Sequence, residues 1–94
     1  MHNSELYRRQ ELLEYLRIKS TALHDRVKNK TMVSPLNFGG KLSVYPKQEV
    51  DAITAAYSLN YSEKQIQELV ASLEEKRTES AQAFLKQLKM EGKL

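Results

Sequence analysis

Residues 33–45 have the sequence VSPLNFGGKLSVY, in which short alternating runs of apolar residues flank a Gly-Gly pair. Leu36 and Phe38 lie at alternate positions on one side of the pair, and Leu42 and Val44 lie so on the other. Alternation is typical of a strand that buries one face, and glycine supplies the positive φ angles that a tight turn needs. The stretch therefore predicts a small β-hairpin.

A short helix is expected before the hairpin, at residues 9–16. Leu12, Leu13 and Leu16 fall on one stripe when this segment is wound as a helix, and acidic residues flank the stripe. Such a stripe indicates a helix that buries one face. A tight connection follows, in which Ile18 is the apolar anchor.

A second helix is expected to begin at Lys19–Ser20. Ser20 suits its N-cap, because a serine hydroxyl accepts a hydrogen bond from a backbone N–H that the helix leaves unpaired. Leu23 and Val27 are one helical turn apart and form its buried pair. Two short helices joined by about three residues constitute a helix-turn-helix pattern.

A third helix is expected directly after the hairpin. Pro46 suits its first turn, because proline lacks the N–H that this turn leaves unpaired. The apolar face of this helix consists of Val50, Ile53, Ala56 and Tyr57.

A fourth helix is expected from Ser62 onward. Residues 62–65 match a capping box, and Tyr61 with Ile66 matches a hydrophobic staple. The apolar stripe of this helix lapses around residues 77–81 and then resumes. We expect one helix of about 28 residues, ~42 Å long, with a weak middle.

Charge is distributed unevenly along the chain. Its 94 residues include 15 Lys and Arg and 12 Asp and Glu, for a net charge of +3. Residues 8–47 hold nine basic and three acidic side chains, a balance of +6, whereas the six basic and six acidic side chains of residues 62–94 cancel. A basic segment beside a neutral one is typical of a polyanion-binding module with a structural tail. Within the tail, the charged run at residues 74–77 is expected to face solvent.

Composition excludes several classes of site. The apolar fraction is 40% and the charged fraction is 29%, which is typical of one small globular domain. The chain has no Cys and two distant His, so neither a disulfide framework nor a metal site is expected. No apolar run is long enough to span a bilayer and no signal peptide is evident, so we expect a soluble, cytoplasmic protein. No catalytic or phosphate-loop pattern occurs, and we expect neither enzyme activity nor a cofactor.

Three segments combine in a pattern that spans residues 7–57. They are residues 20–28 (STALHDRVK), residues 35–41 (PLNFGGK) and residues 45–50 (YPKQEV). This pattern resembles the AlpA-like prophage regulators and excisionases, in which the three segments are the recognition helix, the wing and the supporting helix. The resemblance implies a mainly α fold with a small β-hairpin, a MerR-like winged helix-turn-helix, which a long C-terminal amphipathic helix follows in this chain.

The chain departs from the family pattern at several positions. The family often has Gly where this chain has Arg17 and Lys30, and its recognition helix commonly carries an aromatic residue and Arg in place of His24 and Asp25. The base preferences of the family therefore do not carry over. The tail from Ser62 onward has no counterpart in the minimal family module.

The expected organisation has three parts: a flexible lead-in at residues 1–6, a DNA-binding domain at residues 7–58 and a helical tail at residues 59–94. The apolar stripe of the tail must pack on its own domain or on a second chain. We expect a second chain, which gives a homodimer or a cooperative assembly on DNA. The expected oligomerisation residues are Ile66, Leu69, Val70, Leu73, Phe84 and Leu88.

The second helix is the expected reader of DNA. With its apolar pair inward, a rotation of about 100° per residue points Thr21, Asp25 and Lys28 outward. Ser20 and Thr21 are expected to contact phosphate, and His24 and Lys28 to donate to guanine. Asp25 either accepts from cytosine N4 or is a surface carboxylate paired with Lys28, and the sequence leaves both open. The expected DNA-contacting residues are Arg8, Arg9, Lys19, Ser20, Thr21, His24, Asp25, Arg26, Lys28, Asn37, Gly39, Gly40 and Lys41.

These expectations describe a sequence-specific protein of a phage or mobile element that binds double-stranded DNA. As an excisionase, which is a recombination directionality factor, it would bend DNA and assist an integrase; as a transcription regulator it would occupy a promoter. The alternative hypothesis is a protein-interaction module that binds a regulator or an integrase through its wing domain or its helical tail.

Overall fold

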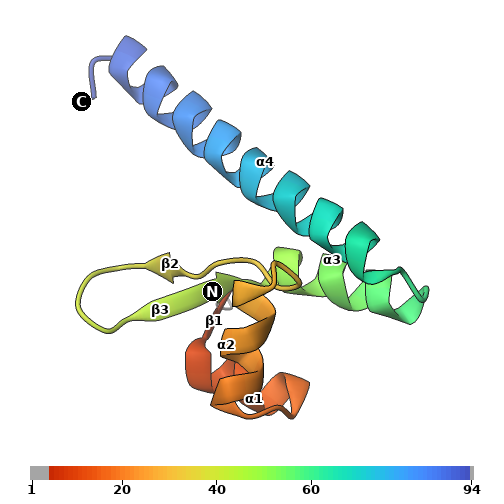
Figure 1. Ribbon diagram of the computed structural model, residues 1–94. Helices are drawn as coiled ribbons and strands as arrows, with labels where there is room; N and C mark the ends of the chain where they lie inside the picture. The colour runs from red at the N-terminus through yellow and green to blue at the C-terminus, as the bar shows by residue number, and fades with distance from the viewer. Residues whose placement is uncertain (1–4, 94) are drawn as a thin grey trace.

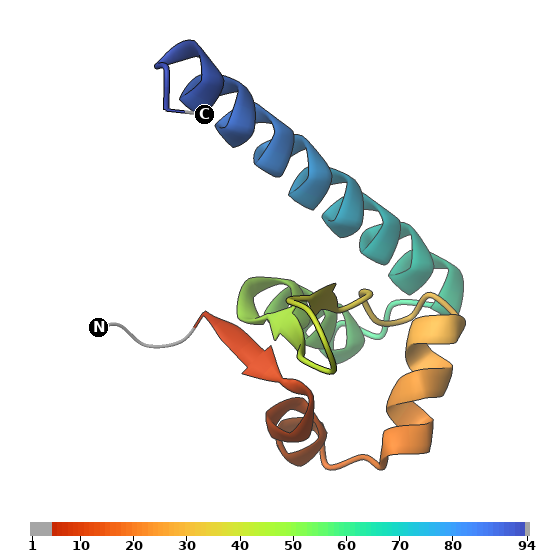
Figure 2. The same ribbon diagram turned by 90° about the vertical axis from the view of Figure 1, so that its left-hand side faces the viewer.

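The computed structural model describes residues 5–93, which form four helices and a small three-stranded antiparallel sheet (Figure 1). In chain order the elements are β1 (Leu6–Arg8), α1 (Arg9–Leu16), α2 (Ser20–Lys28), β2 (Leu36–Asn37), β3 (Ser43–Pro46), α3 (Lys47–Ser58) and α4 (Glu63–Met90). The sheet and α3 lie between the α1–α2 pair on one side and α4 on the other (Figures 1 and 2). The expectation of a mainly helical chain with a small hairpin is confirmed.

The connections at the ends of α2 differ in detail from the expectation. Ser20 is the first residue of α2 and Lys19 is its N-cap, so the prediction that Ser20 caps this helix is wrong. The Ser20 hydroxyl instead accepts a hydrogen bond from the Arg9 guanidinium. Arg17 before α2 and Lys30 after it have φ angles of +57° and +65°. These are the two positions at which the resembled family often has glycine.

β1 is an element that the sequence did not predict. We expected a flexible lead-in at residues 1–6, but Leu6 begins β1 and pairs with Pro46 of β3. The carbonyl oxygen of Glu5 also accepts a hydrogen bond from the first amide of α3, at 2.9 Å. The rest of the lead-in, residues 1–4, lies outside the described residues. A three-residue strand is too short to show an alternating pattern, and its ladder depends on β3, which lies far along the chain.

The predicted β2–β3 hairpin is confirmed. Its ladder pairs Leu36 with Val44, and Gly39 and Gly40 in its loop have φ angles of +99° and +56°. A Cβ atom at either glycine would meet no atom within 4 Å, so the left-handed backbone, and not a lack of space, is what favours glycine there. Pro46 is the last residue of β3 and the N-cap of α3, one position before the expected first turn.

The core draws side chains from every helix. Leu12 of α1, Leu23 of α2, Val50 and Ile53 of α3 and Ile66 of α4 are all almost completely buried. Burial of each such side chain contributes roughly 1.5–3 kcal/mol. The hydrophobic core is therefore shared among elements that are distant in sequence.

The first half of α4 belongs to this core. Ile66 and Val70 are 1% exposed, and Leu69 and Leu73 pack partly buried against the same cluster. The expectation that these four residues pair two chains is wrong, because the domain's own core takes up their side chains. The expected domain boundary between residues 58 and 59 consequently cuts through one core.

The second half of α4 extends away from the rest of the chain (Figure 1). α4 is a single helix of 28 residues, as expected, and its N-terminal capping box is formed by Ser62 and Gln65. Beyond the core, Phe84, Leu85 and Met90 are exposed. Among residues 5–93, no helix is both long enough and apolar enough to cross a membrane.

Candidate nucleic-acid interface

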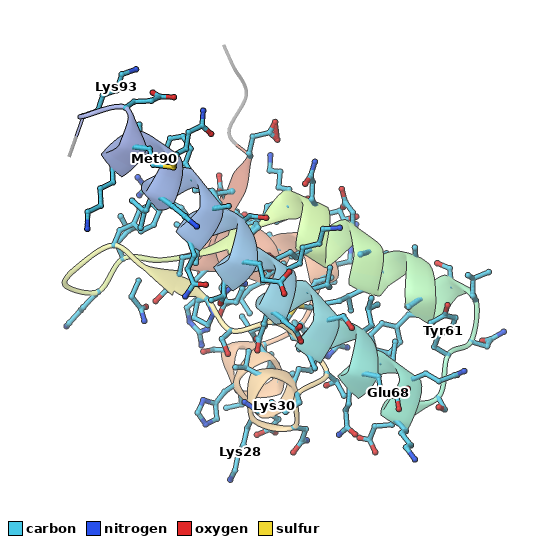
Figure 3. The ribbon with its side chains drawn as sticks, turned by 90° about the horizontal axis from the view of Figure 1, so that it is seen from above. Lys28, Lys30, Tyr61, Glu68, Met90 and Lys93 are labelled. Atoms are coloured by element: carbon cyan, nitrogen blue, oxygen red, sulfur yellow. The ribbon has the colours of Figure 1, made fainter. Side chains whose placement is uncertain are left out.

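α2 is oriented as the spacing of its apolar residues predicts. Leu23 is fully buried and Val27 is half-buried, so Thr21, Asp25 and Lys28 face solvent. Figure 3 shows the Lys28 side chain extending away from the domain. The outward face of α2 thus presents a hydroxyl, a carboxylate and an ammonium, which are groups that hydrogen-bond base edges.

A groove of about 240 Å³ lies beside this face, between α2 and the hairpin. Its walls bring together three side chains that are far apart in sequence, namely Arg9, His24 and Ser43. They provide a guanidinium, an imidazole and a hydroxyl, all of which can donate to phosphate or to base edges. The other residues of the groove are Val27, Pro35 and Tyr45.

Ser43 and Tyr45 are residues of this groove that the sequence analysis did not assign to the site. They lie two positions apart on β3, so they share one face of the strand. The alternation of these two residues can be predicted from the sequence. The contact of their face with α2 cannot be predicted in this way, because it depends on how the hairpin folds back over the helices.

Arg9 is held at the junction of α1, α2 and β3. Its guanidinium donates to the Ser20 hydroxyl and to the Ser20 carbonyl oxygen. Burial raises the pKa of the Tyr45 hydroxyl, and the neighbouring Arg9 guanidinium offsets part of this rise. Tyr45 therefore keeps its proton near neutral pH, and Arg9 provides the positive charge of the groove.

Two basic side chains of the positive segment lie over aromatic rings instead. The Arg26 guanidinium lies 5.8 Å from the ring centre of Tyr57, and the Lys47 ammonium lies 5.0 Å from that of Tyr7. Tyr57, expected on the apolar face of α3, is 43% exposed beneath Arg26. Such cation–π contacts hold each cation against the domain. Arg26, which was expected to contact DNA, is therefore not among the residues that line the groove.

The remaining expected residues lie at the edges of the groove face. Asn37 is exposed on β2, and its Oδ1 accepts a hydrogen bond from the Ser43 hydroxyl at 3.0 Å. Gly39, Gly40 and Lys41 are exposed in the loop that ends the hairpin, and Figure 2 views the hairpin from that end. Arg8 and Lys19 are exposed where α1 and α2 begin.

Asp25 faces solvent on α2 without an ion pair. In the part of the chain that the structure describes, the ion pairs are Arg77 with Glu49 and Lys93 with Glu91. The alternative in which Asp25 pairs with Lys28 is therefore not observed. Its carboxylate is available to a partner that approaches α2.

The sequence analysis also did not predict a polar contact between α4 and the base of the hairpin. The Glu74 carboxylate accepts a hydrogen bond from the Ser34 N–H at 2.7 Å, and Arg77 donates to the Ser34 carbonyl oxygen at 3.0 Å. Arg77 also forms a two-pronged ion pair with Glu49 of α3. We name Ser34, Glu49, Glu74 and Arg77 the hairpin clamp.

The hairpin clamp corrects the expectation of a solvent-facing charged run at residues 74–77 for Glu74 and Arg77, whereas Glu75 and Lys76 are exposed as expected. The side chains of Arg77 and Glu49 are only 21% and 12% exposed. The i, i+3 spacing of Glu74 and Arg77 places both on one face of α4, and this spacing was visible in the sequence. Their partners depend on the tertiary packing.

The described residues hold no group of three or more His, Asp or Glu side chains placed to bind a metal ion. The geometry offers instead a surface of hydrogen-bond donors with one exposed carboxylate. Comparisons of this chain with protein-family models, with curated proteins and with solved structures find no match.

Proposed function

We propose that this chain is a winged helix-turn-helix protein that binds double-stranded DNA, with α2 in the major groove and the β2–β3 hairpin as its wing. The observation that carries the proposal is the groove between α2 and the hairpin. There, Arg9, His24 and Ser43 come together beside the exposed face of α2. A helix with one face in the core and a polar outer face is what major-groove binding requires.

Charge supports the same surface. The balance of +6 lies in residues 8–47, which include α1, α2 and the hairpin. Contacts to phosphate supply most of the affinity of a DNA-binding protein, whereas side chains on the reading helix supply the specificity. The single carboxylate on the outer face of α2 is then a candidate acceptor for cytosine N4.

Within this proposal the protein serves a phage or another mobile element, as an excisionase, as a transcription regulator or as both. Either activity consists of binding and deforming DNA, without covalent chemistry. Mapping the DNA sites that the protein binds in its parent genome distinguishes an excisionase from a transcription regulator. Several sites beside an attachment end indicate excision with an integrase, and one site at a promoter indicates regulation.

The exposed end of α4 supports a second contact, between two copies of the chain. Phe84 and Leu85 are more than half exposed, and Leu88 is half-buried on the same stripe. This end lies on the side of the sheet opposite the α1–α2 pair (Figures 1 and 2), so pairing there leaves α2 free. The alternative function, a protein-interaction module, would use the same apolar stripe.

A salt titration with a mixed-sequence duplex tests the proposed function. If four or five basic side chains meet phosphates, log K falls against log salt with a slope of about −4. Lys41→Ala, which would remove one of these phosphate contacts, is expected to reduce the magnitude of the slope by about 1, and Lys86→Ala on the far half of α4 provides the matched control. Binding that does not respond to salt, or no binding at low salt, would contradict the proposal.

A further inference from the structure

The hairpin carries an apolar pair beyond the part that the core covers. Leu36 is paired with Val44, and Val44 is 5% exposed. Two positions further along, the Phe38 N–H donates to the Leu42 carbonyl oxygen at 3.0 Å. Residues directly opposite each other share one face of a hairpin, so Phe38 and Leu42 continue the apolar face past the domain.

These two side chains are exposed where the fold does not require them. Phe38 is 59% exposed and Leu42 is 38% exposed. Single exposed apolar residues are common, but an aromatic residue and a leucine side by side at the end of a projecting hairpin form a patch. We name residues 38–42 the hairpin tip.

The surroundings of the hairpin tip indicate a polyanion as its partner. Lys41 lies in the tip, and residues 26–48, which include the whole hairpin, contain no Asp or Glu. The partner therefore combines negative charge with apolar surface. The minor groove of DNA does so, because the C–H surfaces of its sugar walls are apolar and lie between two rows of phosphates.

The shape of the hairpin tip suits entry into a narrow groove. Gly39 and Gly40 form its leading edge and have no side chains, and the space around both is open. The minor groove is about 6 Å wide, and a slender hairpin that enters it meets a wall on each of its faces. Phe38 and Leu42 on one face then contact the base steps and sugars, while Lys41 reaches a phosphate.

We propose that Phe38, flanked by Leu42, is a wedge that enters the minor groove, partly unstacks one base step and bends the DNA. Phe and Leu are among the side chains that minor-groove proteins insert in this way. The inference rests on the proposed function and adds to it the means of deforming DNA. It assigns Phe38 to the DNA contact, which the sequence analysis did not.

The test uses the full chain and a mixed-sequence duplex of about 30 base pairs that contains several TA steps, which unstack most easily. Fluorophores at the two ends report bending by energy transfer, and 2-aminopurine in place of adenine at the TA steps reports unstacking. The variants are Phe38→Ala and, as the control, Leu59→Ala. Leu59 is also an exposed apolar side chain (69%, against 59% for Phe38), and it lies at the C-terminal end of α3, outside both the hairpin and the stripe proposed for pairing.

The wild-type protein and Leu59→Ala are expected to raise both energy transfer and 2-aminopurine fluorescence. Phe38→Ala is expected to lose both signals and to bind about tenfold more weakly, because it lacks the wedge. Thermal unfolding followed by circular dichroism is expected to be unchanged, because Phe38 lies outside the core.

Three results would overturn the wedge. If Phe38→Ala binds and bends DNA like the wild-type protein, the wedge is wrong and the proposed DNA binding stands. If Phe38→Ala changes the sedimentation of the DNA-free protein, the hairpin tip contacts another protein chain instead. If the wild-type protein binds no duplex at low salt, the proposed function and the wedge fail together.

Discussion

At the residue scale, two side chains hold backbone conformations that favour glycine. Arg17 and Lys30 lie in the left-handed region on either side of α2, where a side chain costs about 1–2 kcal/mol relative to glycine. We expect Arg17→Gly and Lys30→Gly each to raise the free energy of unfolding by about 0.5–1 kcal/mol, after the larger chain entropy of glycine is subtracted. Urea denaturation measures the change.

Glu68→Gly is the control for these two substitutions. Glu68 is exposed within α4 and has helical backbone geometry, so glycine there is expected to lower the stability by about 1 kcal/mol. A loss of stability in Arg17→Gly or Lys30→Gly would show that the left-handed geometry at that residue is wrong.

A second prediction at this scale separates residues that read DNA from residues that hold it. Asp25→Ala removes the exposed carboxylate of α2. It is expected to reduce the difference in binding free energy between specific and random DNA by ~1–3 kcal/mol. Lys41→Ala removes the phosphate contact that we propose for the hairpin tip, and it is expected to weaken binding to both DNAs almost equally. Fluorescence anisotropy with a selected site and a scrambled one gives both affinities.

One result for Asp25→Ala would exclude a role of Asp25 in recognising bases. If it strengthens binding to every sequence alike, Asp25 only repels the phosphate backbone.

At the scale of elements, the hairpin clamp joins α3 and α4 to the base of the hairpin. Arg77→Ala removes its hydrogen bonds to Glu49 and Ser34 and leaves the Glu49 carboxylate without a partner in a largely buried position. We expect a loss of about 1.5–3 kcal/mol of stability, which is typical for hydrogen bonds to charged groups. Hydrogen exchange at the hairpin amide of Phe38 is expected to become faster, because the strand that follows Ser34 is less restrained.

The double substitution Arg77→Ala with Glu49→Gln tests the cause of this loss. Because the unpaired charge is then absent, the double variant is expected to be more stable than Arg77→Ala alone. Lys76→Ala changes an exposed neighbour on α4 and is expected to alter stability by less than about 0.5 kcal/mol. If Arg77→Ala behaves like Lys76→Ala, the clamp does not stabilise the fold.

At the scale of the whole molecule, the two halves of α4 have different roles. Truncation after Glu79 retains Ile66, Val70 and Arg77 and removes the exposed stripe with Phe84 and Leu85. We expect this truncated chain to be a folded monomer, and we expect the full chain to self-associate at micromolar concentration. Analytical ultracentrifugation compares the two proteins.

Truncation after Tyr61 is the contrasting case. It removes Ile66 and Val70 from the core, and the loss of two buried aliphatic side chains costs several kcal/mol in a domain of this size. We expect this shorter chain to lose its cooperative unfolding transition. A full chain that stays monomeric while the Glu79 truncation also folds would remove the basis for pairing through α4.

Much of this fold follows from local sequence signals. The bounds of α1, the presence of α2, the hairpin around Gly39 and Gly40, and the continuous α4 were all predicted, because helical periodicity, strand alternation and glycine turns act over a few residues. The outward face of α2, with Thr21 and Asp25, followed from the same periodicity. Each of these features is determined by interactions among residues that are close together in the sequence.

Tertiary structure alone decided which surfaces meet. An apolar stripe such as that of Ile66 and Val70 indicates that a helix face is buried, but burial against the own core and burial against a second chain produce the same pattern. Likewise, the contact of Arg9 with Ser20 and that of Arg77 with Ser34 join segments between which the sequence shows no periodic relation. Hydrophobic burial has no direction of its own, so the partner of each face is set only when all the elements pack together.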